Sequence, residues 1–335
     1  MPMPGGSDLH INAPLTNVSI AYFQDPNNFI ADKVFPGIPV DKRSDAYWKY
    51  GKSDWRRTDA KKRAPGTESA GIGWEPTTDQ YYAEVYAVHQ DIDDQTRANA
   101  DSNWRLDADA TRLLTSHLLI QKDQLWTSTY FQSGVWATEA LGVPSGATGT
   151  QFLQWNQANS NPLADVTNFQ TNFKLLTGYD TNFMVLGANV WKALKNHPAI
   201  LDRIKYTQTG VVTKDLVASF FDIPAGRLLV AYSSQATGPQ VPDAPTQDAG
   251  MTYSWIHNPN SALLGFAPTA PGLLTPSAGY TFNWRGYGAG NRYGLTFAQM
   301  RMPQLKADRI EGEAAYVMKQ VSADCGIFLN TAVSG

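Results

Sequence analysis

Two strand-like runs, residues 46–50 and 81–88, flank a long stretch that contains few apolar side chains to bury in a core. Both runs are rich in aromatic and β-branched residues, the composition of β-strands. Between them lies the polar, glycine-rich segment 64–73, APGTESAGIG. Together they predict a long hairpin whose tip cannot pack against the rest of the chain. A structureless tip of this length is either disordered or held by a partner.

A second constraint is an uninterrupted helical pattern near residues 106–131. Leucine, alanine and tryptophan recur there at the i, i+3, i+4 spacing of an amphipathic helix, without Gly or Pro. Asp107 and Asp109 fall in the predicted first turn, where acidic side chains interact favourably with the helix dipole. At a rise of about 1.5 Å per residue this helix spans roughly 40 Å, which is long for a globular protein.

The remaining segments predict a mixture of strands and helices. Residues 1–45 hold six prolines and little periodicity, which is typical of an extended arm with short turns. Residues 190–204 are predicted as a helix kinked at Pro198. Strand-like apolar runs recur at residues 182–186, 227–232, 314–318 and 325–329. These elements together predict an α+β fold.

Charge is sparse and unevenly placed. Asp, Glu, Lys and Arg make up 17% of the 335 residues, against about 25% in a typical soluble domain. Residues 49–63 carry a net charge of +5, residues 91–109 carry −4, and residues 228–284 contain no Lys or Arg. Ten Trp and fifteen Tyr accompany six Glu, the bias of surfaces that are buried between subunits. The composition therefore fits either a subunit of a large assembly or a monomer whose surface consists of uncharged polar groups, glycine and exposed aromatic residues.

The two charged blocks suggest how neighbouring subunits meet. We expect the basic hairpin of one subunit to lie against the acidic start of the long helix in another. The residues predicted to make these inter-subunit contacts are Lys52, Arg56, Arg57, Lys61, Lys62, Arg63, Asp91, Asp93 and Asp94. An alternative is that the basic run binds phosphate while Tyr50 and Trp55 stack on bases. Asp54 and Asp59 within the run favour the protein contact.

Sequence patterns for catalysis or cofactor binding are largely absent. The chain has no phosphate loop, no H-E-x-x-H and no G-x-S-x-G. The aspartates at 91–94 do not begin an EF-hand, because Thr96 and Ser102 stand where that loop needs Gly and Glu. The five histidines lack ligand spacing, and Cys325 lies in an apolar run that predicts burial. We therefore expect no catalytic residue, no cofactor and no metal.

A carbohydrate-active hydrolase is the distant alternative among enzymes. It would need two carboxyl groups in one cleft, and the sequence ranks no pair above another among Glu68, Glu75, Glu84 and Glu139. The first ten residues do not resemble a secretory signal, and no run approaches the roughly 18 apolar residues of a membrane span. We expect synthesis in the cytoplasm and no membrane partner.

Several short motifs resemble the major capsid proteins of tailed bacteriophages. The resemblance covers about residues 30–110, whereas residues 140–300 match only in general layout. The motifs are VFP at 34–36, PVDKRSD at 39–45, DWRR at 54–57, RAPGTES at 63–69 and VHQDIDDQTRANA at 88–100. The resemblance implies the fold named after phage Hong Kong 97, with an N-terminal arm, an extended loop, a peripheral domain containing a long spine helix, and an axial domain.

The predicted elements follow that order along the chain. They are an arm at 1–45, an extended-loop hairpin at 46–85, a peripheral domain at 86–159 with the spine helix near 106–131, an axial domain at 160–298, and a return to the peripheral domain at 299–335. The resemblance implies a non-enzymatic subunit that assembles through hexamers and pentamers into an icosahedral shell around packaged DNA, within the virion.

The resemblance also implies partners and leaves one rival function. Expected partners are further copies of the chain, a separate scaffolding protein, a portal and a decoration protein, with DNA contacted in the shell interior without sequence specificity. Assembly is expected in the host cytoplasm. The rival function is an encapsulin-like nanocompartment shell protein that holds enzyme cargo.

Overall fold

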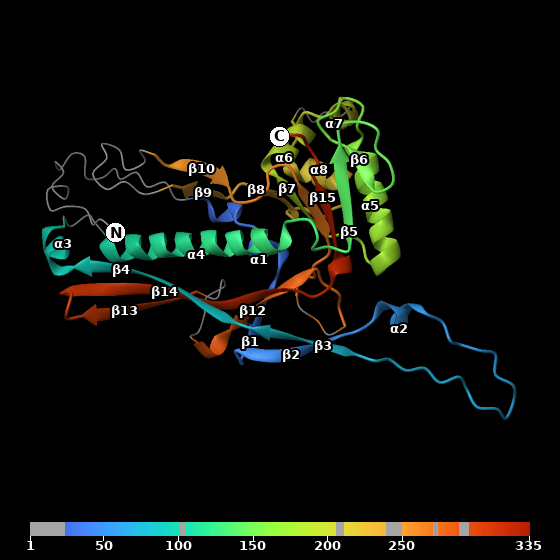
Figure 1. Ribbon diagram of the computed structural model, residues 1–335, viewed down its shortest axis with the longest axis horizontal. Helices are drawn as coiled ribbons and strands as arrows, with labels where there is room; N and C mark the ends of the chain where they lie inside the picture. Colours follow the sequence, from blue (N-terminus) through green and yellow to red (C-terminus); the bar gives the residue numbers. More distant parts are fainter. Residues whose placement is uncertain are drawn as a thin grey trace.

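The structure is a computed structural model, and it describes residues 24–100, 105–205, 211–238, 250–270, 272, 274–287 and 295–335. Of the predicted arm, residues 1–23 lie outside the described residues. Two large sheets, one long helix and a projecting loop are the main features of the described residues (Figure 1). Within the described ranges, no helix is both long and apolar enough to cross a lipid bilayer.

The first sheet has five strands, and the long strand β14 lies at its centre. Strand β14 pairs through its first part with β13 and β4, one along each edge, and through its last part with β12, which in turn pairs with β1. Their bounds are β1 Gly37–Val40, β4 Glu84–Asp93, β12 Gly279–Trp284, β13 Leu295–Met302 and β14 Ala307–Gln320.

Helix α4 (Leu106–Tyr130) lies along this sheet and is the predicted spine helix (Figure 1). Its inner face buries Leu114, Leu118 and Trp126. Trp126 meets the ring of Phe35 edge-on at 6.0 Å, so the helix also holds the segment that follows α1 (Ala31–Val34). The helix predicted at about 106–131 is confirmed to within one residue.

The second sheet has six strands in the order β6, β5, β15, β11, β7 and β8. Their bounds are β5 Thr138–Val143, β6 Gln151–Leu153, β7 Phe183–Gly187, β8 Leu228–Ala231, β11 Ala262–Gly265 and β15 Gly326–Asn330. Residues Met184 and Leu186 of β7 pack into one core and Phe183 and Val185 into another. Because both faces are covered, the central strands are continuously apolar.

Four helices cover the outer face of the second sheet (Figure 1). They are α5 Pro162–Thr177, α6 Ala188–Lys195, α7 Pro198–Ile204 and α8 Lys214–Phe220. The single kinked helix predicted for residues 190–204 is wrong, since α6 and α7 are separate. Pro198 opens α7, where its missing N–H costs nothing, and His197 caps that helix by accepting from Ala199 N.

Two further strand pairs stand apart from the main sheets. Strands β2 (Ser44–Lys49) and β3 (Thr77–Tyr82) form the base of the projecting loop, and β9 (Ser234–Thr237) pairs with β10 (Thr252–Trp255). The remaining elements are η2 Pro26–Asn28, α2 Lys52–Arg56, α3 Asp94–Asn99, η3 Arg285–Tyr287 and η4 Ala323–Cys325.

The predicted hairpin differs from the structure at its second strand. Residues 81–88 form two strands instead of one, because the chain passes from β3 to β4 at the fully buried Ala83. There the N–H of Ala83 donates to the carbonyl of Arg43 at 2.8 Å. β3 therefore pairs within the loop, while β4 joins the five-stranded sheet.

Strand pairing also crosses the boundaries proposed at 159/160 and 298/299. β5 and β6 join the six-stranded sheet although they precede residue 160, and β15 of the C-terminal segment lies in the same sheet. Conversely, β12 joins the five-stranded sheet. The pairings of β5 with β15 and of β12 with β14 link strands that are not neighbours in the sequence, and such partners carry no local signature.

Candidate assembly surface

Among the described residues, the loop of residues 50–76, which connects β2 to β3, is almost entirely exposed. Apart from α2 it has no helix or strand, and it projects away from both sheets at one end of the molecule (Figure 1). A turn at Ala64 forms near its tip, where Thr67 donates through its N–H and its hydroxyl to the Ala64 carbonyl. This extended loop contributes nothing to either main core.

Large aromatic side chains at the base of the loop are open to solvent. Trp55 and Trp74 stack at 5.8 Å with an interplanar angle of 17°, and Tyr50 meets Trp55 edge-on at 6.3 Å. Their exposed fractions are 55%, 62% and 40%, and Ile72 is 81% exposed. Exposed apolar clusters of this kind mark interaction surfaces.

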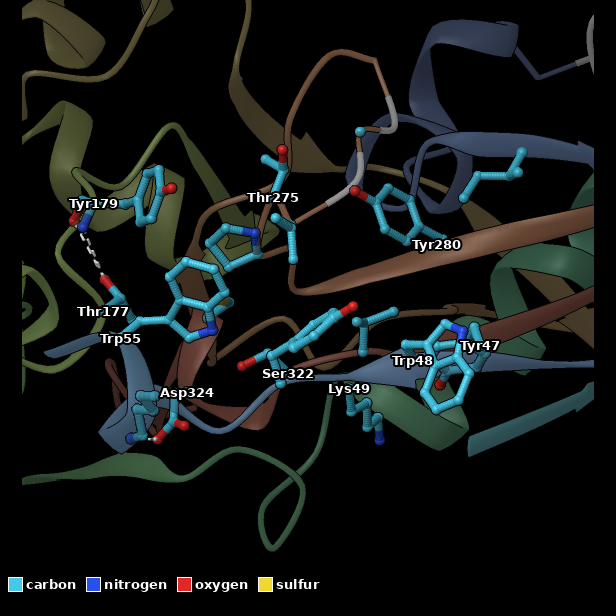
Figure 2. A pocket seen from close by; sticks show the side chains of 18 of the residues that line it. Tyr47, Trp48, Lys49, Trp55, Thr177, Tyr179, Thr275, Tyr280, Ser322 and Asp324 are labelled. Atoms are coloured by element: carbon cyan, nitrogen blue, oxygen red, sulfur yellow. Dashed lines mark hydrogen bonds and ion pairs between the residues drawn. The ribbon is translucent and has the colours of Figure 1, made fainter. Parts of the chain in front are cut away.

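A cleft of about 1020 Å³ opens beside these aromatic residues. It is lined by five segments, namely β1 at Ile38, residues 46–55, the end of α5 with the turn that follows it, β12 with the loop that enters it, and the turn between β14 and β15. Figure 2 shows Trp55 and Asp324 toward one end of the cleft and Trp48 toward the other. Trp48 and Leu274, both on its rim, are 63% and 60% exposed.

Two of the predicted basic contact residues anchor the loop within its own chain. Lys52 forms an ion pair with Asp324 at 2.8 Å, and the guanidinium of Arg56 donates to the Leu176 carbonyl at 2.7 Å. The first contact ties α2 to the turn before β15, and the second ties it to the end of α5. The base of the loop is thereby held against these two elements.

The other four basic residues lie farther out along the loop. Arg57 pairs with Asp59 at 3.2 Å, and Arg63 donates to the carbonyl of Thr67. Lys61 and Lys62 are exposed, and in the part of the chain that the structure describes neither has a partner. These two ammonium groups are free to contact a neighbouring subunit.

The three predicted acidic residues all have partners in their own chain. Asp91 accepts two hydrogen bonds from Arg309 at 2.7 and 2.8 Å, and Asp94 accepts two from Arg301, each at 2.6 Å. These guanidinium groups lower the pKa of both carboxyl groups. Their positive charges also offset much of the negative charge of the acidic block.

Asp93 has a different role at the start of α3. Its carboxylate accepts from the N–H of Thr96 and from the Thr96 hydroxyl, each at 2.7 Å, and these bonds lower its pKa. This is the geometry of a helix N-cap. The sequence motif DIDDQT contains the capping pattern, but the arginine partners of Asp91 and Asp94 lie more than 200 residues away and had no local signal.

Replacing Asp93 separates its capping role from any charge contact with a neighbour. D93A is expected to destabilise α3 by about 1 kcal/mol, measured as faster amide exchange in residues 94–99. D93N keeps a side-chain acceptor without the charge and should preserve most of this protection. If D93N folds like the parent but assembles poorly, the negative charge itself contributes to the contact between subunits. Equal exchange in D93A and the parent would contradict the capping role.

The structure does not assemble a hydrolase site from the candidate acids. None of the four glutamates that the sequence offered lines the cleft. Glu84 accepts from Tyr86, and Glu139 accepts from the N–H of Gly134. Among the described residues, no group of three or more His, Cys, Asp or Glu could hold a metal ion. Cys325 is buried as predicted, and burial raises the pKa of its thiol to about 11.

Comparisons with known proteins place this architecture. No family model matches the chain. It is 23% identical over 218 residues to the major capsid protein of Burkholderia phage BcepMu, covering 65% of this chain and 68% of that protein. It is 28% identical over 196 residues to the major capsid protein of Pseudomonas phage JBD67, covering 57% of this chain. This second alignment spans 58% of the JBD67 protein, less than two thirds of its length.

Solved structures share the fold over nearly the whole chain. A phage-related protein from Bordetella bronchiseptica RB50 superposes with a TM-score of 0.65 at 17% identity, over 92% of this chain and 94% of that one. A chain of the capsid of cyanophage P-SCSP1u superposes with a TM-score of 0.60 at 13% identity, over 99% of this chain and 96% of that one. The SrpI encapsulin of Synechococcus elongatus PCC 7942 gives 0.52 at 8% identity, over 95% and 93%.

The superpositions on the solved structures cover nearly the whole chain and so include the spine helix, the extended loop and the two large sheets. The sequence relatives are both phage capsid proteins, and the structural neighbours carry the same α+β fold. The resemblance noted in the sequence is confirmed: the chain is similar in sequence to the major capsid proteins of phages, and it has the capsid fold named after phage Hong Kong 97.

Proposed function

We propose that the chain is the major capsid protein of a tailed bacteriophage, without catalytic activity, and that it assembles through hexamers and pentamers into an icosahedral shell around a DNA genome. The observation that carries this proposal is the extended loop on a capsid fold. Its exposed Trp55, Trp74 and Ile72 would be costly to leave in water, at about 25 cal/mol for each Å² of apolar area. A neighbouring subunit is the partner that would cover them.

The shape of the molecule supports head-to-tail association. The extended loop and the acidic start of α4 lie at opposite ends of its long axis (Figure 1). When two different surfaces of one subunit meet, repetition of the contact closes a ring if the rotation allows it. Hexamers and pentamers are rings of this kind.

The proposed contact pairs the basic loop of one subunit with the acidic end of the next. Lys61 and Lys62 supply cations that have no other partner among the described residues. On the opposite end, Asp109 is 60% exposed and pairs with Arg112 at 3.6 Å, and Asp107 is 48% exposed but accepts two hydrogen bonds from Arg97. Asp91, Asp93 and Asp94 are likewise engaged within the chain. We infer that these last three chiefly shape the surface that the loop contacts.

Further partners follow from this role. A shell of this kind would interact with a scaffolding protein during assembly, with a portal, with a decoration protein, and with DNA on its interior through contacts that do not read sequence. The net charge of −3 is not that of a dedicated nucleic-acid binder. We place the assembled protein in the virion and its assembly in the host cytoplasm.

The encapsulin-like nanocompartment is the second candidate, because the SrpI encapsulin shares the fold. Electron microscopy of the purified protein, with mass measurement by light scattering, tests both shell functions against an enzyme. Closed particles or capsomers support a shell, while a stable monomer of 36.8 kDa contradicts it. Nuclease-protected DNA in particles from native lysates would favour the phage capsid, and particles filled with protein cargo would favour the nanocompartment.

A further inference from the structure

A buried polar cluster lies where α1, α4 and the six-stranded sheet meet. Its centre is Asp123 of α4, which is 1% exposed. One carboxylate oxygen accepts from the N–H groups of Ile30 and Ala31 at 3.1 and 2.9 Å, and the other accepts from the hydroxyl of Ser233 at 2.8 Å. Asp123 therefore ties the start of α1 to the C-terminal third of the spine helix.

Among the described residues, no Lys or Arg forms an ion pair with Asp123. Lys122, which is 4% exposed, pairs with Asp32 at 2.6 Å rather than with Asp123, and its ammonium lies 4.6 Å from the centre of the Tyr316 ring. Lys33 also faces the cluster, but its ammonium donates to the Asn27 carbonyl. An ionised carboxylate without its own cation is costly to bury.

This environment favours the protonated form of Asp123. Burial is the main cause that raises the pKa of Asp123 to about 6, and the negative charge of Asp32 acts in the same direction. The hydrogen bonds from Ala31 and Ser233 oppose the shift. The carboxyl group can therefore take up a proton under mildly acidic conditions.

His257 lies on the other side of Ser233 and is 1% exposed. Its Nδ1 is 3.1 Å from the Ser233 hydroxyl, and its Nε2 is 3.9 Å from the Asp123 carboxylate. Burial lowers the pKa of His257 to about 3. Between pH 3 and 6, as these two pKa values imply, a proton that enters the cluster is held by Asp123, and the imidazole stays neutral.

We propose that Asp123, Ser233 and His257 form a proton-operated latch, which holds α1 against α4 more firmly when Asp123 takes up one proton from solvent. In the ionised state the Ser233 hydroxyl donates to Asp123, so the imidazole must donate from Nδ1 to Ser233. In the protonated state Asp123 donates to Ser233, Ser233 donates to Nδ1, and the imidazole proton resides on Nε2. The other carboxyl oxygen still accepts from Ile30 and Ala31.

The direction of the effect follows from proton linkage. The pKa of Asp123 is raised from 3.8 to about 6 in the closed arrangement. A local opening that hydrates the carboxyl group returns its pKa toward 3.8, so the closed form binds the proton more tightly. The extra stability of the closed form is complete below about pH 3.8 and is lost as the pH rises through 6. Between pH 7.5 and 5, opening is expected to become about tenfold rarer.

Hydrogen exchange of the full-length protein tests the latch, with mass spectrometry of the peptide that covers residues 24–35. After correction for the intrinsic dependence of exchange on pH, the rate in this peptide should fall about tenfold from pH 7.5 to pH 5. An unchanged rate would overturn the proposal. A rate that rises toward pH 5 would also overturn it, because it would mean that hydration of His257 dominates the opening.

Three variants sharpen the test. D123N mimics the protonated carboxyl group, so its peptide should exchange slowly at both pH values; faster exchange than in the parent at both would contradict the latch. S233A removes a hydrogen bond that lowers the pKa of Asp123. The pH at which the exchange rate of residues 24–35 changes should therefore move upward, and this variant remains informative if D123N does not fold.

D165N is the matched control. Asp165 lies in α5 and is another carboxyl group whose pKa is raised by burial. Its replacement should leave the pH dependence of exchange in residues 24–35 unchanged.

Discussion

Replacing Lys61, Lys62 and Arg63 together by glutamate is expected to abolish shell formation while the subunit stays folded. The triple variant changes the charge of the loop tip by six units. Lys61 and Lys62 have no partner among the described residues, and Arg63 contacts only the Thr67 carbonyl of the same loop. The folded chain therefore loses almost nothing, whereas the proposed contact with an acidic neighbour becomes repulsive.

The effect should be large because the contact repeats around every ring. A like-charge juxtaposition across an interface costs several kcal/mol, and each subunit uses the contact in combination with others. Size-exclusion chromatography with light scattering and negative-stain microscopy would report assembly, and far-UV circular dichroism would report folding. The variant with glutamine at all three positions is the matched control, and we expect it to assemble weakly. Normal shells from the glutamate variant would contradict the proposed contact.

Replacing Gly187 by alanine is expected to destabilise the subunit strongly. Gly187 ends β7 just before α6, and a Cβ there would lie 2.3 Å from the carbonyl oxygen of Pro259 and 2.6 Å from that of Asn258. These are backbone atoms, and Pro259 also accepts from the N–H of Asn189 at 3.0 Å. Relief of the clash would have to separate these elements.

Overpacking at a site with no room to adjust costs about 3 kcal/mol or more, a large fraction of the stability of a domain. The yield of soluble G187A and its unfolding in urea would measure the loss. G73A is the matched control, because a Cβ at Gly73 meets no atom within 4 Å; its stability should match that of the parent. A G187A protein with parental stability would show that the loop at 258–260 can move away without cost.

The elements with strong local patterns were predictable, and those defined by distant partners were not. The spacing of apolar residues located α4, and continuous apolar character located β7 and β8. By contrast, the single strand predicted for 81–88 is split at Ala83, because its two parts join different sheets. Likewise, the sheet that each of β5, β12 and β15 joins is determined by pairing partners that are not adjacent in the sequence. The domain boundaries proposed at 159/160 and 298/299 could not anticipate these pairings.

The candidate site shows the same division. The exposed basic loop was evident from residues 49–63 and the polar segment beyond them, because a stretch without apolar periodicity cannot join a core wherever the chain folds. The cleft, however, is built from five separate segments. The partners of Asp91 and Asp94 lie 218 and 207 positions away, so nothing near these aspartates indicated that their charges are already neutralised.

By itself the sequence determined the α+β class, the spine helix, the projecting loop and, through its motifs, the kinship with phage capsid proteins. Those features depend on short-range periodicity and on residue types, which neighbours in the chain already specify. Only the tertiary structure decided which strands pair, which charges are free, and that Asp123, Ser233 and His257 meet in one buried cluster. The reason is physical: burial and desolvation change the ionisation of Asp123 and His257, and both arise only when segments distant in sequence pack together.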